Sequence, residues 1–202
     1  MDYEQEALDF IARPENIGAA LEIARLVDQM RPRLQKDFWV AVTTKAESIL
    51  LASELAKSWQ VIAEHQNYRS SYAGLVIAPK EFEYGQRYLR VRLEQGRRQE
   101  EYPLYYGVKW DRDFSWKQMN VLKSLRNSLI SQGFGEENNW WIGYKYLGTY
   151  HMHKQEFLLR MGTDQEALVA EMASQLFELL ETNLKEIEAI NNALKQPPHL
   201  PA

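Results

Sequence analysis

The 202-residue sequence predicts an α+β domain, because its hydrophobic residues change period twice along the chain. Over the first quarter they recur every three or four positions, as on one face of a helix. Over residues 59–110 they alternate, as in half-buried strands. The last thirty or so residues return to helical spacing. This order predicts N-terminal helices, an antiparallel meander sheet of about four to five strands and a long C-terminal helix.

Two prolines divide the helical first quarter. Residues 2–12 are predicted to form a short helix that ends at Arg13, since a proline disfavours helical geometry in the residue before it. Pro14 suits a first helical position, and apolar residues follow it at helical spacing. Pro32 is expected to break or kink the chain again, so that a separate long helix runs from about residue 32 to 56.

Four strands are predicted in the alternating region, separated by polar or glycine-bearing turns: 59–64, 72–79, 88–95 and 103–110. Connections this short imply antiparallel pairing. The third strand places Leu89, Val91 and Leu93 on one face. Its other face carries Tyr88, Arg90, Arg92 and Glu94. We expect one packed face and one face in solvent.

The second half opens with a capping-box pattern at 115–118, which predicts a helix that ends before Gly133. The segment "NNWWIGYKYLG" (138–148) is predicted to be a strand, and 149–162 is ambiguous between strand and helix. A second capping box at 163–166 begins the final helix. Its apolar stripe is too long to leave in water, so we expect it to be needed for folding or dimerisation.

We therefore expect a single α+β domain over residues 1–196, followed by a disordered tail at 197–202. Its parts are a helical region (1–57), the meander sheet (58–112), a helix (115–132), a strand region (138–160) and the long helix (163–195). The net charge is −4, but seven acidic residues lie in the final helix, and the rest is close to neutral. With no cysteine, no signal peptide and no long apolar run, we expect a cytoplasmic protein.

No catalytic motif stands out in the sequence. His151 and His153 lie two apart with Glu156 nearby, and surface histidines in a strand are the favoured interpretation. Asp111 and Asp113 suit Mg²⁺, but also suit the start of a helix. We therefore predict no catalytic residue, no metal and no cofactor.

The strongest functional feature is a basic ribbon of Arg90, Arg92, Arg97, Arg98 and Lys109. On an exposed strand face and turn, these side chains would contact the phosphates of a nucleic acid. The alternative is that they pair with neighbouring acids, namely Glu94, Glu100 and Glu101. The sequence favours the second interpretation and leaves the first open.

Two aromatic pairs also have two interpretations. Trp140-Trp141 and Tyr105-Tyr106 lie in predicted strands. They would suit base stacking or a ligand cage. Aromatic residues on alternating strands more often fill a core against helices, and that interpretation is favoured.

The order of segments resembles the C-terminal portion of bacterial PD-(D/E)XK nuclease superfamily proteins. The resemblance lies in "RPENIGAALEIARLVDQMRPRLQKDFW", "YAGLVI", "LRVRLEQ", "LYYGVKW", "NNWWIGYKYLG" and the acidic last helix, covering most of residues 10–195. Such nucleases hold Mg²⁺ with an Asp and a Glu-x-Lys on neighbouring strands. No acidic residue here has a lysine two positions later. The resemblance therefore implies a part of such a protein without the catalytic residues.

These observations together predict a non-catalytic recognition or assembly domain of a restriction-like or prophage defence protein. One alternative is a stand-alone inhibitor or immunity-type protein that binds another protein. Another is an enzyme that uses Asp111, Asp113 and a histidine. The partners left open are a nucleic acid at the basic hairpin and a protein, or a second copy, at the C-terminal helix, and no membrane association is expected.

Overall fold

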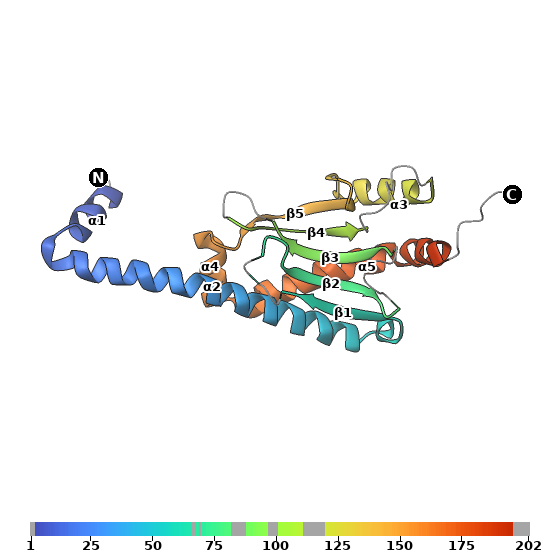
Figure 1. Ribbon diagram of the computed structural model, residues 1–202, viewed down its shortest axis with the longest axis horizontal. Coiled ribbons are helices and arrows are strands. Elements are labelled where there is room, and N and C mark those ends of the chain that lie inside the picture. Colours follow the sequence, from blue (N-terminus) through green and yellow to red (C-terminus); the bar gives the residue numbers. More distant parts are fainter. Residues whose placement is uncertain are drawn as a thin grey trace.

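The computed structural model describes residues 3–65, 68, 70–81, 88–96, 101–110 and 120–195 (Figure 1). The helices are α1 (Tyr3–Ile11), α2 (Pro14–Leu51), the 3₁₀ helix η1 (Glu54–Lys57), α3 (Asn120–Ser131), α4 (Gln155–Thr163) and α5 (Gln165–Lys195). The strands are β1 (Trp59–Glu64), β2 (Gly74–Pro79), β3 (Arg90–Gln95), β4 (Pro103–Lys109) and β5 (Trp141–His151).

The predicted α+β class and the antiparallel meander are confirmed. The five strands form one sheet in the order β1-β2-β3-β4-β5, and every neighbouring pair is antiparallel. In the central register, Leu93 lies between Leu75 and Tyr106. The helices α2 and α5 pack on the face that these residues share, which we call the first face. The opposite side of the sheet is called the second face.

The predicted break at Pro32 is wrong, because α2 runs without interruption from Pro14 to Leu51. A proline inside a helix leaves the carbonyl four residues earlier without its hydrogen bond. Here that carbonyl belongs to Asp28, which is exposed and can be hydrated. The missing bond therefore costs less at this position than it would in a buried helix.

An N-terminal arm, made of α1 and the first part of α2 to Met30, extends away from the sheet (Figure 1). The helix α1 has no buried residue, and the first buried residue of α2 is Gln35. The arm nevertheless exposes large apolar side chains, namely Leu8, Phe10, Ile11, Ile17, Leu21, Ile23, Leu26 and Met30. An apolar surface of this extent is typical of an interaction site.

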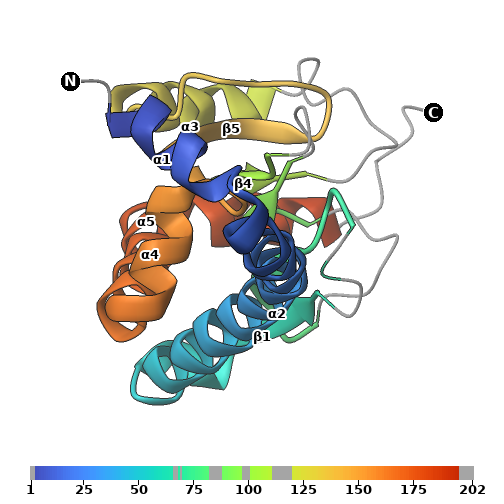
Figure 2. The same cartoon turned by 90° about the vertical axis from the view of Figure 1, so that its left-hand side faces the viewer.

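The apolar stripe of α5 is covered by the chain itself. Nine apolar side chains of the helix larger than alanine are buried: Leu168, Val169, Met172, Leu176, Phe177, Leu179, Leu180, Ile187 and Ile190. They join one core with α2 and the first face of the sheet, and α4 and α5 lie beside α2 (Figure 2). Asn191 also fixes the helix to the sheet, because its amide accepts from the Leu89 N–H at 2.7 Å and donates to the Leu89 carbonyl at 3.1 Å. The stripe thus gives no reason to expect a second copy at this helix.

The capping box predicted at the start of the final helix does not form. Thr163 ends α4 and its hydroxyl donates to the Leu159 carbonyl, so the predicted capping box at 163–166 does not begin α5. The ambiguous segment contains both the end of β5 and α4. The other capping box at 115–118 and the tail at 197–202 lie outside the described residues. Among the helices that the structure describes, none combines the length and apolar character that a bilayer crossing requires.

Candidate functional site

The expectation that Arg90 and Arg92 project into solvent is wrong. Both lie on the second face as the alternation predicts, but they are only 5% and 6% exposed. The neighbouring Glu94 is 1% exposed, and all six residues of β3 are buried. In this conformation, Arg90 and Arg92 are too deep to supply phosphate contacts. Arg97 and Arg98 lie outside the described residues, so the rest of the predicted ribbon stays a prediction.

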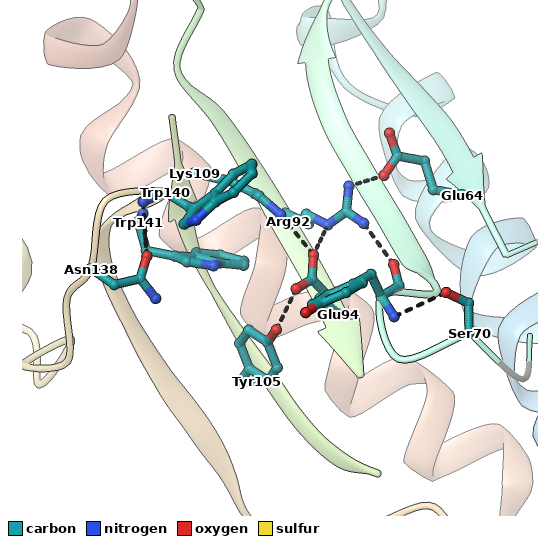
Figure 3. Close-up of polar contacts among 10 residues, drawn as sticks. Glu64, Ser70, Arg92, Glu94, Tyr105, Lys109, Asn138, Trp140 and Trp141 are labelled. Carbon is teal, nitrogen blue, oxygen red and sulfur yellow. Dashed lines mark hydrogen bonds and ion pairs between the residues drawn. The ribbon is translucent and has the colours of Figure 1, made fainter. Parts of the chain in front are cut away.

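Arg92 lies between two carboxylates on the second face. Its guanidinium forms ion pairs with Glu64 of β1 and, at 2.5 Å, with Glu94 of its own strand (Figure 3). In the register, Gly74 of β2 lies between Glu64 and Glu94, and a Cβ at this position would clash with the backbone of Leu93. The pairing is what a buried guanidinium requires, because an isolated charge is costly away from water.

Glu94 is the centre of the buried network. One carboxylate oxygen accepts a hydrogen bond from the Tyr105 hydroxyl. The other accepts from the Lys109 ammonium at 2.8 Å and also contacts Arg92 (Figure 3). Tyr105 lies directly opposite Glu94 on β4, so the hairpin register itself brings these groups together.

Polar contacts hold Tyr72 at the edge of this network. Arg92 donates a hydrogen bond to the Tyr72 carbonyl at 2.8 Å. The buried amide of Gln95 donates to the carbonyls of Tyr68 and Ser70, which fixes the chain just before Tyr72. The Tyr72 side chain itself remains exposed. The network thus orders the backbone while the ring stays accessible.

Two tryptophans around the start of β5, Trp140 and Trp141, lie beside this network. The Asn138 side-chain oxygen accepts from the backbone N–H groups of Trp140 and Trp141, at 2.8 and 3.2 Å. The backbone N–H of Trp110 donates to the Trp140 carbonyl at 2.7 Å. The two indoles lie close to Lys109, whose ammonium is 5.8 Å from the Trp140 ring centre and 5.1 Å from that of Trp141 (Figure 3). Both contacts are cation–π interactions.

These groups surround a pocket of about 350 Å³ on the second face. Buried charged groups lie at its base and aromatic rings form its sides. The lining residues are Tyr72, Glu94, Tyr105, Lys109, Asn138, Trp140 and Trp141. Such a combination, apolar surface around a few fixed polar groups, is typical of a small-ligand site. We call it the second-face pocket.

Burial perturbs the protonation of two groups in the pocket. Burial, together with the positive charge of Arg92, lowers the pKa of Lys109 to about 8 against the opposing effect of Glu94. Burial also raises the pKa of Tyr105 well above its usual range, with a further contribution from the Glu94 charge. Perturbed groups of this kind cluster at functional sites.

The lowered pKa of Lys109 predicts a rise in stability with pH. Between about pH 8 and 10.5 the unfolded chain keeps a proton on this lysine that the folded protein has released. The free energy of unfolding of the wild type, relative to that of Lys109→Met, is therefore expected to rise by up to about 3 kcal/mol over this window. Denaturant unfolding of both proteins at pH 7.5, 9 and 10 tests this. A difference that stays constant or falls with pH would contradict it.

The other sequence candidates do not join this site. His151 forms an ion pair with Glu101 at 3.1 Å, and the His153 ring lies edge-on to Tyr102. Asp111 and Asp113 lie outside the described residues. Within the part of the chain that the structure describes, no group of three or more histidine, aspartate or glutamate side chains is arranged to hold a metal ion.

A second hollow, of about 380 Å³, lies between β1, β2 and the end of α5. It is slightly larger than the second-face pocket. Its charged residues include Lys195 and Glu81, which pair with each other and are largely exposed. Exposed pairs of this kind are common on protein surfaces and contribute little to stability. The second-face pocket is the stronger candidate, because its charges are buried and held in place.

The fold and the pocket define an α+β protein with a ligand-sized site on one face of an antiparallel meander sheet. No protein-family model, curated protein or solved structure matches the chain.

Sequence reasoning identified part of this site. It named Lys109, as a phosphate contact, and the Trp140-Trp141 and Tyr105-Tyr106 pairs. The structure separates the tyrosines, with Tyr106 in the core and Tyr105 at the pocket. Sequence reasoning missed Tyr72 and Asn138, and treated Glu94 only as a surface partner. One signal was present: "LVIA" in β2 is a continuous apolar run, which is typical of a strand buried on both faces.

Proposed function

We propose that the chain is a non-catalytic recognition domain of a restriction-like or prophage defence protein, and that the second-face pocket is its recognition site. The order of segments supports the protein class. The observation that carries the recognition role is the buried network of Lys109, Glu94 and Tyr105 directly beneath an open aromatic pocket. Protein interiors rarely hold such charges without a structural or functional reason.

The hydrogen bonds of Glu94 favour binding over catalysis. A general base needs a free lone pair that can reach the substrate proton. Tyr105, Lys109 and Arg92 already occupy three of the roughly four acceptor sites of this carboxylate, and Glu94 is only 1% exposed, so a substrate proton has little access to it. The network is therefore suited to holding a fixed shape and charge.

A thermal-shift experiment with two probes tests the recognition role. The probes are a six-nucleotide oligothymidylate and a peptide with one trimethyllysine, since aromatic pockets bind both bases and quaternary ammonium groups. At a concentration 100-fold above its Kd, a bound probe raises the free energy of unfolding by about 2.7 kcal/mol. This raises Tm by roughly 5–10 °C.

We expect at least one probe to stabilise the wild type but not Trp140→Ala. We also expect both probes to remain uncleaved in the presence of Mg²⁺. The proposal fails if neither probe shifts the wild type. It also fails if purified protein cleaves the oligonucleotide with Mg²⁺.

A second candidate function is binding to protein, as expected of an inhibitor or immunity-type protein. The observation that favours it is the N-terminal arm with its exposed apolar side chains. A second copy of this chain is the simplest occupant, because a two-fold contact needs only this one surface. A dimer in sedimentation experiments that dissociates on Leu21→Ser would favour this candidate.

A further inference from the structure

We infer that the second-face pocket takes a single unpaired nucleobase, stacked on the exposed aromatic rings and hydrogen-bonded to Lys109. The inference rests on the proposed recognition function and specifies its ligand.

The aromatic rings of the pocket are placed for stacking on a base. Trp140 is 39% exposed and Tyr72 is 64% exposed, and both line the pocket. Trp141 is buried beside Lys109 and packs edge-on against Tyr105, with 5.4 Å between the ring centres. The pocket therefore has one fixed, buried aromatic side and accessible aromatic rings at its mouth. Base–aromatic stacking is the main way in which proteins hold single-stranded nucleic acids without reading sequence.

Lys109 can donate hydrogen bonds to a base. An ammonium has three N–H donors. Among the described residues it donates one hydrogen bond, to Glu94 at 2.8 Å. Its side chain is only 12% exposed, so the remaining donors gain little from bulk water. Carbonyl oxygens and ring nitrogens of a nucleobase are acceptors that would complete this set.

A cationic ligand does not fit the charges of the pocket. Aromatic pockets with a carboxylate usually bind quaternary ammonium groups. Here the protein's own ammonium, on Lys109, already lies over both indoles. The Glu94 carboxylate is already paired with Lys109 and Arg92. A second cation would meet like charge without a free counter-ion, whereas a neutral base with acceptor atoms would not.

The size of the pocket agrees with one base and little more. At about 350 Å³ it is near the lower end of the range for small-ligand sites. This volume leaves little room beyond the base, so the sugar and phosphate are expected to remain at the mouth. Recognition by the base predicts that removing the base, with every phosphate kept, abolishes binding.

The test is calorimetric titration of the full chain at 0.15 M salt. The ligands are oligothymidylate of six nucleotides, an abasic hexamer of the same backbone, free thymidine and the trimethyllysine peptide. The variants are Trp140→Ala, Trp140→Phe and a matched control, Tyr146→Ala. Tyr146 is an exposed ring of the same sheet face that does not line the pocket.

We expect oligothymidylate to bind and the abasic hexamer to bind at least tenfold more weakly. Trp140→Ala should weaken binding by roughly 5- to 150-fold, the range for losing one stacked base, while Trp140→Phe and Tyr146→Ala remain close to the wild type. Thymidine that binds as tightly as the hexamer would identify a free nucleoside, instead of a strand, as the source of the base.

Two results would overturn the inference: equal affinity for the abasic hexamer, or no effect of Trp140→Ala. If the trimethyllysine peptide binds through Trp140 and oligothymidylate does not, the recognition function stands and the nucleobase is wrong. If no ligand binds, both fail.

Discussion

Glu94→Gln is expected to lower the free energy of unfolding by about 3–5 kcal/mol at pH 7, the usual cost of breaking a buried ion pair from one side. The substitution keeps the shape of the side chain but removes the charge that balances Arg92 and Lys109. Arg92 and Lys109 would then be buried without this negative charge beside them. Urea unfolding followed by circular dichroism measures the loss.

Glu101→Gln is the matched control for this substitution. Glu101 also pairs with two basic groups, His151 and Lys154, but it is 39% exposed. Water screens such pairs, so its loss is expected to cost less than about 1 kcal/mol. Equal effects of the two substitutions would show that the Glu94 network is no more stabilising than a surface pair.

Truncation after Gly162 is expected to abolish cooperative folding. The removed helix α5 buries nine apolar side chains larger than alanine in the core. At about 1.5–3 kcal/mol each, their burial contributes roughly 14–27 kcal/mol, which exceeds the net stability of most domains. The truncated chain should be insoluble, or show no thermal transition by calorimetry.

Two full-length variants separate the loss of core from the loss of chain length. Leu176→Ala removes one buried side chain of α5 and should cost about 2–5 kcal/mol. Glu181→Ala lies on the exposed side and should stay within about 0.5 kcal/mol of the wild type. A truncated chain that melts like the full-length protein would refute the central role of α5.

The fold could be predicted from the sequence where apolar and polar residues recur at regular spacing. The alternation in β3 and β4 predicted the strands, and their short connections predicted the meander. The Pro32 prediction failed because this part of the helix is exposed. Water can hydrate the carbonyl that the proline leaves without a hydrogen bond. Local patterns thus predicted the elements better than their exact ends.

The site could be predicted only in part, because it depends on contacts between distant segments. Alternation correctly put Arg92 and Glu94 on the same face. It could not show that this face is buried, or that Tyr72 and Trp140 converge on it from segments almost seventy residues apart. The basic ribbon was therefore taken for a surface, whereas the structure makes part of it the base of a pocket.

Hydroxyl-radical footprinting with mass spectrometry tests most directly whether the second-face pocket is the recognition site. The full-length protein would be oxidised with and without saturating oligothymidylate, and the oxidation rate of each aromatic residue compared. We predict slower oxidation of Trp140 and Tyr72 in the presence of the oligonucleotide, with no change at Tyr146. Unchanged rates at Trp140 and Tyr72, or protection confined to the N-terminal arm, would contradict the assignment of this pocket.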